Sequence, residues 1–452
     1  MQSHVIRLLP FSAFIFIFNV VIFSSSMLAN GQTEQVIYNF SGSDGSVPTA
    51  GLLVDRAGNF YGTTLFGGGC GQGTVFELTP AAGQWTLTTL HALCSSYYTS
   101  DGHEGGNPAG SLTFDNQGNL YGTTTVGIFY EFQSDENNAH PTAKPPECCE
   151  YFSYYGPGTA FQLLKPTSTG APWTINPLFV FDSGAPSGKL SLDSAGNVYG
   201  VDNDGSDQGY RTCNPCGTVF ELSPQPVGQL WTVSYPHSFG SYLGDGLNPA
   251  WDLLALNGTL YGTTRLGGTS SQGTVFEVRN VNGAWVQTVI HNFTINEGGA
   301  PEGQLIADPA GNLYGTTYID GKTSCTLGCG TVFELSPPAA PGGPWKETTL
   351  YTFTGGADGG KPQTGLARDT AGNLYGTNTT GGTGDGVVFK LVAPTSAGGT
   401  WKEVTLHQFV GKPTDGSSPL GKLLLVGGTK LFGTTSRGGK NDIGTVFTVT
   451  LP

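Results

Sequence analysis

The feature that most constrains this fold is a repeat that occurs seven times along the chain. Each copy holds an aromatic-glycine pair in a string close to Gly-Asn-Leu-Tyr-Gly-Thr-Thr, and a second string close to Gly-Thr-Val-Phe-Glu-Leu follows. The aromatic residues of the first string are Tyr61, Tyr121, Tyr199, Tyr261, Tyr314, Tyr375 and Phe432. The second string opens at Gly73, Gly158, Gly217, Gly273, Gly330, Gly386 and Gly444. A fixed order at a period of about 60 residues indicates one structural unit copied along the chain.

Each copy divides into four short apolar runs separated by turn residues. In the first copy these runs cover 51–55, 59–64, 74–78 and 85–93. The Asp-x-x-Gly-Asn turn that begins at Asp55 favours a tight hairpin, because Asp can bond the turn backbone and Gly can take a positive φ. Four such strands make one propeller blade. We therefore predict an all-β, seven-bladed β-propeller with four antiparallel strands per blade and no helix after residue 31.

The two ends of the chain predict how the ring closes. The last copy, 421–451, stops after its third strand, whereas residues 34–40 form a spare strand at the other end. This spare segment resembles the ends of the fourth strands at 289–293 and 350–353. Since a closed array removes unpaired strand edges, we predict that 34–40 completes the last blade.

Residues 1–31 have the layout of a secretory signal peptide. The basic Arg7 precedes an apolar run over 8–23, and small residues follow. The alternative is an uncleaved anchor, but the apolar run is short for a membrane span. The remaining residues, 32–452, are predicted to form a single propeller domain without a later membrane span. We therefore expect a secreted, periplasmic or cell-surface protein.

Charge excludes one class of partner. The formal net charge is −14, and removal of Arg7 with the leader leaves 18 basic and 33 acidic residues, or −15. Such a surface repels phosphate backbones and anionic membranes, which excludes nucleic-acid binding. The partners that remain are an extracellular glycan or protein, and the propeller is expected to be a monomer.

The two repeated strings, with the Gly-Gly loop between them, resemble the GloVer tandem-repeat family of exported bacterial proteins. The resemblance covers about residues 34–452. It implies an extracellular or surface repeat protein and supplies no catalytic residues. The Asp-x-x-Gly-Asn-x-Tyr turn also looks like that of NHL-type propellers, although this similarity is confined to one hairpin.

Most histidines and tryptophans follow the repeat. Four histidines lie six residues after the tryptophan that opens a fourth strand: His91, His237, His291 and His407. Phe179 and Tyr351 take the same position in two other copies. A position that accepts His, Phe or Tyr favours packing of a flat ring over a ligand role. Six tryptophans are predicted to pack between blades, while Trp251 instead begins the first strand of the fourth copy.

The eight cysteines are typical of an oxidising compartment. Three disulfides are predicted from the loop positions: Cys70 with Cys94, Cys213 with Cys216, and Cys325 with Cys329. Cys148 and Cys149 remain as a strained vicinal pair or free thiols. A zinc site built from the third and fifth blades is disfavoured, because a whole blade separates these thiols.

The largest departure from the repeat lies in the second copy. There, Gly158 follows Gly122 by 36 positions, whereas Gly73 follows the equivalent Gly62 by 11. With the preceding connection, this insertion provides the predicted ligand-binding residues: Tyr97, Tyr98, His103, Glu104, His140, Glu147, Glu150, Tyr151, Phe152, Tyr154 and Tyr155. Aromatic rings beside acids suit a glycan or protein ligand. The alternative is that the insertion buries its own aromatics in a satellite cluster.

An acid also recurs before each first strand. The Asp-Gly-x-x-Pro string begins at Asp44, Asp245, Asp358 and Asp415. Turn formation explains it, and loose calcium binding by a ring of acids at the pore mouth is the alternative. No metal site and no cofactor are predicted.

These observations favour an exported, non-enzymatic binding module that uses the loop-rich face. No Ser-His-Asp, paired-carboxylate or metal constellation stands outside the repeat register. The alternative is a carbohydrate-active or lactonase-like hydrolase with acids from different blades in the central channel. Its sign would be two or three convergent carboxylates in the channel without counterparts in other blades. A purely structural role would instead predict a face without any pocket.

Overall fold

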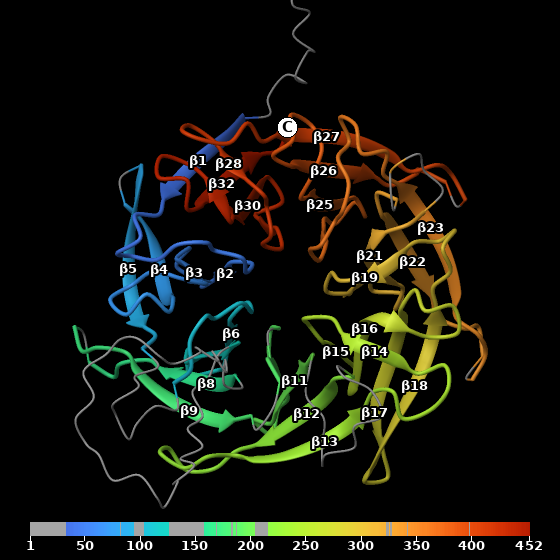
Figure 1. Cartoon of the computed structure of the whole chain (residues 1–452), viewed down its shortest axis with the longest axis horizontal. Coiled ribbons are helices and arrows are strands. Elements are labelled where there is room, and N and C mark those ends of the chain that lie inside the picture. The colour runs from blue at the N-terminus through green and yellow to red at the C-terminus, as the bar shows by residue number, and fades with distance from the viewer. Residues whose placement is uncertain are drawn as a thin grey trace, which may run out of the picture.

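The computed structural model describes residues 33–81, 83–94, 104–125, 158–168, 170–181, 184–186, 188–203, 216–321, 325, 328–340, 342–396 and 398–452. Over these residues the chain forms seven antiparallel sheets of four or five strands arranged in a ring, besides one two-stranded pair, and it contains no helix (Figure 1). The predicted seven-bladed β-propeller is confirmed.

The first three blades follow one another along the chain. Blade 1 contains β2 (Leu53–Val54), β3 (Phe60–Thr64), β4 (Thr74–Ala81) and β5 (Gln84–Ala92). Blade 2 contains β6 (Thr113–Phe114), β7 (Leu120–Thr124), β8 (Thr159–Leu164) and β9 (Thr174–Val180). Blade 3 contains β10 (Ser191–Leu192), β11 (Val198–Asp202), β12 (Thr218–Ser223) and β13 (Thr232–Ser238).

Blades 4 and 5 each divide the first strand into two short pieces. Blade 4 contains β14 (Gly246–Pro249), β15 (Leu254–Leu256), β16 (Thr259–Gly267), β17 (Thr274–Val281) and β18 (Ala284–Asn292). Blade 5 contains β19 (Gly299–Pro301), β20 (Ile306–Ala307), β21 (Leu313–Ile319), β22 (Thr331–Ser336) and β23 (Lys346–Thr352).

Blade 6 contains β24 (Ala367–Arg368), β25 (Leu374–Asn378), β26 (Val387–Val392) and β27 (Lys402–Gln408). Blade 7 contains β29 (Leu424–Val426), β30 (Lys430–Thr435), β32 (Thr445–Thr450) and β1 (Thr33–Asn39), and the small pair β28 (Gly416–Ser417) and β31 (Arg437–Gly438) lies beside it. In every blade the short first strand lies toward the centre of the ring and the fourth strand lies at its periphery (Figure 1).

Closure follows the prediction from the chain ends. Strand β1 pairs antiparallel with β32, so that Glu34 lies opposite Val449 and Gln35 opposite Thr448. Phe40, which directly follows β1, is completely buried, and its ring contacts Phe76 of blade 1 with the ring centres 5.4 Å apart. The first described strand therefore joins blade 7 by its hydrogen bonds and blade 1 by its packing.

The two repeated strings are explained by one cross-strand contact. The glycine of the first string lies opposite the phenylalanine of the second string in all seven blades, as Gly315 lies opposite Phe333. A Cβ on Gly315 would come within 2.5 Å of the Phe333 ring. The glycine is required because the outer atoms of the phenylalanine ring, Cζ and Cε1, lie where a side chain would begin.

The predicted turn and the predicted tryptophan packing are also confirmed. Asp55 Oδ1 accepts hydrogen bonds from the N–H groups of Ala57 and Asn59, at 2.8 and 2.9 Å, and Gly58 has a φ of +87°. Fourth-strand tryptophans pack on the aromatic residue of the first string in the preceding blade, and the ring-centre distances are 5.9 Å for Trp285 on Tyr199 and 6.0 Å for Trp345 on Tyr261.

Two of the three predicted disulfides are present among the described residues. Cys70 is bonded to Cys94 and Cys325 to Cys329, with Cα–Cα distances of 5.3 and 5.7 Å. Cys216 is also disulfide-bonded, and its predicted partner lies outside the described residues, as do both vicinal cysteines: these are Cys213, Cys148 and Cys149. In the part of the chain that the structure describes, no helix has the length and apolarity that a bilayer span requires.

Candidate functional site

Of the predicted ligand-binding residues, only Glu104 falls within the described residues. Its Oε2 lies 3.2 Å from Nε2 of His91. The other ten lie outside the described residues: Tyr97, Tyr98, His103, His140, Glu147, Glu150, Tyr151, Phe152, Tyr154 and Tyr155. The loop surface that they were predicted to form stays a prediction.

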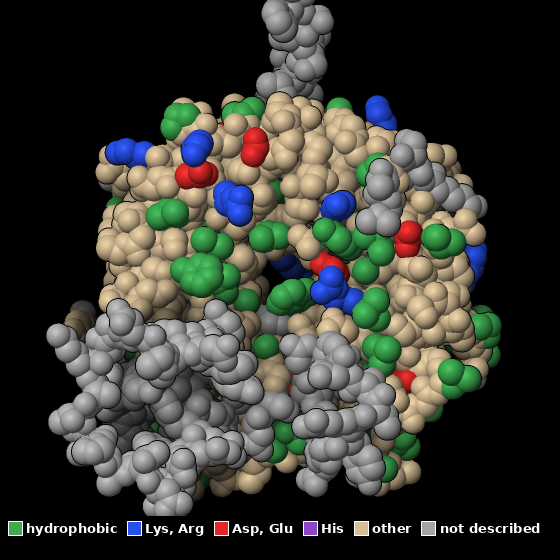
Figure 2. Space-filling model, viewed as in Figure 1, with side chains coloured by type: hydrophobic (Ala, Val, Ile, Leu, Met, Phe, Trp, Pro, Cys, Tyr) green, Lys and Arg blue, Asp and Glu red, His purple; other side chains and the backbone are tan. Residues whose placement is uncertain are grey.

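A cavity of about 420 Å³ lies in the central channel, with lining residues from blades 1, 2, 4, 5, 6 and 7. The molecule is hollowed at its centre, and acidic and basic side chains meet at the rim of the opening (Figure 2). Thr125, which follows β7 directly, also lines this cavity.

The cavity is built from one register of the repeat. Apart from Leu65 and Thr125, its lining residues all belong to the three positions that follow the proline before a first strand. The third of these positions holds, in blade order, Gly51, Ser111, Lys189, Asp252, Gln304, Gly365 and Lys422. Small residues fill it in three blades, and charged or amide side chains fill it in the other four. An alignment of the seven copies at this proline would have revealed these charged residues from the sequence alone, because each is a single-residue departure from the repeat.

Asp252 and Lys422 form the polar centre of this ring of positions. Asp252 Oδ1 accepts a hydrogen bond of 2.5 Å from the Lys189 N–H, and Lys422 Nζ donates one of 2.6 Å to Gln304 Oε1. Burial raises the pKa of Asp252, and attraction to Lys189 and Lys422 opposes this change. Burial lowers the pKa of Lys422 to about 8, which the charge of Asp252 opposes. Burial thus shifts the pKa of each group toward its neutral form.

Glu302 provides a second carboxylate on the channel wall. It is 3% exposed, its Oε1 lies 2.8 Å from an Arg265 guanidinium nitrogen, and its Oε2 accepts a 3.1 Å hydrogen bond from Gln363. Burial raises the pKa of Glu302, whereas the Arg265 charge and both hydrogen bonds lower it. No other copy carries an acid at the repeat position of Glu302, nor at that of Asp252.

Trp251 is the one aromatic residue among the described residues that line the cavity. It is partly exposed, and the same position in the other blades holds Ala50, Gly110, Gly188, Gly303, Thr364 and Gly421. The channel therefore offers one flat apolar ring beside carboxylate, amide and amine groups. This combination suits a small ligand with both an apolar face and many hydroxyl groups.

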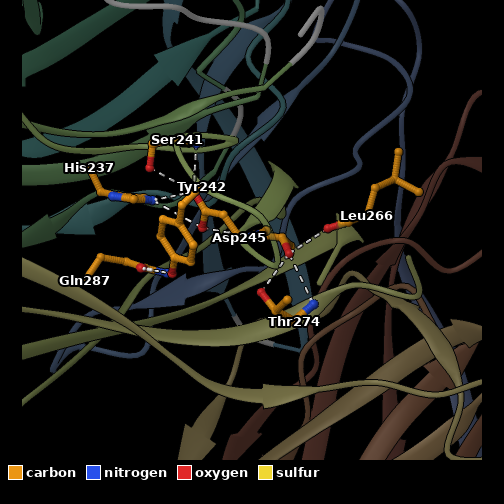
Figure 3. Close-up of polar contacts among 9 residues, drawn as sticks. His237, Ser241, Tyr242, Asp245, Leu266, Thr274 and Gln287 are labelled. Atoms are coloured by element: carbon orange, nitrogen blue, oxygen red, sulfur yellow. Dashed lines mark hydrogen bonds and ion pairs between the residues drawn. The ribbon is translucent and has the colours of Figure 1, made fainter. Parts of the chain in front are cut away.

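The repeated histidine position has a second role besides packing. The ring packs edge-on against the phenylalanine two residues later, as His237 packs on Phe239 with the ring centres 4.8 Å apart. It also faces the acid of the following connection, at 3.1 Å between His237 Nε2 and Asp245 Oδ2 (Figure 3). Equivalent contacts join Tyr38 to Asp44, His91 to Glu104, Tyr351 to Asp358 and His407 to Asp415.

These contacts correct the expected position of the acids in the Asp-Gly-x-x-Pro strings, on which the calcium alternative depended. The acids of the Asp-Gly-x-x-Pro strings bond rings on the peripheral fourth strands, so they do not surround the pore mouth. Their carboxylates also accept backbone N–H groups of the turn, as Asp358 does from Thr354 at 2.9 Å. The predicted role in turn formation is confirmed.

At the junctions between blades, a third side chain reaches these ring-acid pairs from the next blade. This side chain takes the same position on the fourth strand of blades 4 to 7, where it is Gln287, Glu347, Glu403 and Glu34 in turn. Each lies opposite an apolar residue of the third strand: Gln287 opposite Val278, Glu347 opposite Leu335, Glu403 opposite Leu391, and Glu34 opposite Val449. Burial raises the pKa of Glu347 from its ordinary 4.5 to about 7, and the Glu297 charge adds to this shift. A carboxyl group here resists ionisation.

This shift predicts a pH-dependent stability. A pKa that folding raises means that the folded state holds its proton more tightly, so the contribution of Glu347 is complete below about pH 4.5 and is lost as the pH rises to about 7. Glu347→Gln should flatten the fall in melting temperature between these pH values, as measured by calorimetry. Gln287→Glu should steepen it. An unchanged pH profile in both variants would contradict the assignment.

Comparison with known proteins finds relatives of the repeat and of the fold. The Gloeobacter/Verrucomicrobia repeat model matches residues 19–133 and 149–389. A comparison with curated proteins finds no match. Among solved structures, a polysaccharide lyase has 10% sequence identity and a TM-score of 0.51, over 94% of each chain, which is a likeness of fold alone.

Two further solved structures are similar over nearly the whole chain. A candidate gluconolactonase has 13% identity and a TM-score of 0.38, over 93% of this chain and 92% of that one. A candidate oxidoreductase (glucose dehydrogenase) from Thermus thermophilus has 14% identity and a TM-score of 0.41, over 93% of this chain and 100% of that one. These two similarities carry no argument about the site.

Proposed function

Since this chain belongs to the Gloeobacter/Verrucomicrobia repeat family, whose repeat closes here into a propeller with a polar cavity at its axis, we propose that it is an exported binding module for a small sugar or the end of a glycan. The disulfides and the predicted signal peptide, residues 1–31, support export, because disulfides persist in oxidising compartments.

The observation that carries this proposal is the placement of Trp251 among hydrogen-bonding side chains in one cavity. A sugar ring presents a C–H face that packs on an aromatic ring, and its hydroxyl groups both donate and accept hydrogen bonds. Asp252 accepts, Lys422 donates, and the amide of Gln304 does both. A cavity of about 420 Å³ lies within the usual range for small-ligand pockets. The predicted second-blade loop, which begins beside the cavity, would extend this surface toward a longer glycan.

Binding of a panel of neutral and uronic-acid mono- and disaccharides, measured by calorimetry, tests the proposal. Trp251→Ala should weaken the best ligand by about 30-fold, as loss of an aromatic anchor costs about 2 kcal/mol. Gln304→Ala should weaken it by about tenfold. Gln287→Ala, which removes the same side chain at the periphery, should leave affinity unchanged. If no saccharide binds, or if Trp251→Ala binds like the unaltered chain, the ligand site lies outside the channel.

A second candidate function, a carbohydrate-active hydrolase, is favoured by the two channel carboxylates, Asp252 and Glu302. Burial raises the pKa of both carboxyl groups, and Asp252 is the better general acid because Glu302 is ion-paired with Arg265, which favours its ionised form. Lys422, with a pKa of about 8, could accept a proton from water in the same cavity. Release of reducing sugar from an oligosaccharide, abolished by Asp252→Asn while binding persists, would identify an enzyme. Binding without turnover would identify the binding module.

A further inference from the structure

Three metal-ligating side chains meet at the periphery of the ring, where blades 6 and 7 join. Glu34 lies on β1, His407 on β27, and Asp415 in the connection that follows β27. One ligand atom from each lies within 4.8 Å of the other two. Ligands about 2.1 Å from a tetrahedral ion lie about 3.4 Å from one another, so a small inward movement of Glu34 would complete a three-ligand site.

One carboxylate oxygen of Glu34 lacks a hydrogen-bond partner among the described residues. Glu34 Oε1 is buried and has no hydrogen-bond partner among the residues that the structure describes. Gln287 has the same register in blade 4, and its carbonyl oxygen accepts a 2.7 Å hydrogen bond from the Tyr242 hydroxyl (Figure 3). A buried carboxylate oxygen without a partner is costly, and a bound cation would satisfy it.

The other two ligands are already held in place. Asp415 is 5% exposed, and its two oxygens accept the N–H groups of Gly416 and Val410 at 2.6 and 2.9 Å. The His407 ring packs on Phe409 with the ring centres 4.7 Å apart, and its Nε2 lies 2.9 Å from Asp415 Oδ2. Such outer contacts fix the orientation of metal ligands before the ion binds. A bound ion would take the place of the hydrogen bond between His407 Nε2 and Asp415 Oδ2.

The junction between blades 4 and 5 shows that residue types alone do not make the site. It carries His291, Glu297 and Glu347 in the same register, with His291 Nε2 3.7 Å from Glu297 Oε2, but the three ligand atoms do not all lie within 4.8 Å of one another. Among the described residues, only the set at the junction of blades 6 and 7 brings three ligand atoms within 4.8 Å of each other.

From this geometry we propose that Glu34, His407 and Asp415 bind one divalent transition-metal ion, with Zn²⁺ the best fit. One imidazole and two carboxylates suit Zn²⁺ and Mn²⁺ better than Ca²⁺, which prefers six or more oxygen ligands. The remaining coordination position would hold water. Because Glu34 belongs to the closing strand and the other two ligands to blade 6 and its connection, the ion ties β1 to the neighbouring blade.

Titration of metal-free full-length protein with Zn²⁺, followed by calorimetry and by thermal unfolding, tests the proposal. We expect one ion per chain and a melting temperature that rises with Zn²⁺ concentration. Glu34→Gln, which reproduces the residue found in blade 4, should stay folded and lose at least about 100-fold in affinity. His237→Gln, which removes a His-Asp pair without a third carboxylate, should bind as the unaltered chain does.

Three results would overturn the assignment. One is the absence of stoichiometric binding of Zn²⁺ or Mn²⁺. Another is unchanged affinity in both Glu34→Gln and His407→Gln. The third is an intense thiolate charge-transfer band after Co²⁺ substitution, which would place the ion on cysteine. A Co²⁺ spectrum typical of nitrogen and oxygen ligands, lost in Glu34→Gln, supports it.

Discussion

Phe40→Ala should lower the free energy of unfolding by about 3–5 kcal/mol, the usual cost of deleting a fully buried phenylalanine ring. The ring packs on Phe76, in a buried cluster that also holds Phe60 of blade 1 together with Phe432 and Val446 of blade 7. Its loss opens a cavity at the seam where the two ends of the chain meet. Urea unfolding followed by tryptophan fluorescence measures the change as a lower midpoint.

A matched control shows whether the loss of stability is specific to the buried seam. Phe66→Ala removes the same ring where it is 45% exposed, and its effect should stay below about 1 kcal/mol. If the two variants unfold at the same urea concentration, β1 does not hold the ring closed. A chain lacking residues 33–40 should go further and aggregate, because β32 would then present an unpaired edge.

Gly315→Ala should destabilise the propeller by about 1–3 kcal/mol, as expected for overpacking a filled core. The added methyl group would meet the Phe333 ring at 2.5 Å and Leu305 at 2.9 Å, and both of these side chains are fully buried. The midpoint of chemical unfolding measures the loss.

Phe333→Leu makes this explanation testable. It removes the atoms that the new methyl group meets, so the double variant should lose less stability than the sum of the two single variants, by about 1 kcal/mol. Gly69→Ala is the control, since nothing lies within 4 Å of a Cβ there, and it should change stability by less than about 0.5 kcal/mol. Additive effects of Gly315→Ala and Phe333→Leu would rule out the ring contact as the cause.

The sequence predicts the fold well because its determinants are local and repeated. The turn at Asp55, the glycine opposite each phenylalanine and the tryptophan of each fourth strand recur at fixed spacing, and each has a local physical reason. Closure was also predictable, because the missing strand of the last copy and the spare strand 34–40 are complementary.

The candidate sites could not be predicted in the same way. Asp252, Glu302 and Lys422 break the repeat by single residues, and only the closed ring gathers them around one axis. Glu34 and His407 meet because β1 lies beside blade 6, a contact between segments at opposite ends of the sequence. The predicted loop surface on the second blade followed from an insertion, and ten of its eleven residues lie outside the described part of the chain.

The composite seventh blade also sets the order of events during synthesis. A chain is made from its N-terminus, so β1 leaves the ribosome long before its partner β32. The contact between Asn39 Oδ1 and the Lys440 N–H spans 401 residues of sequence. The ring cannot close until nearly all of the chain has left the ribosome, and until then β1 lacks the strand with which it pairs. Closure of the ring is therefore expected to be a late step of folding.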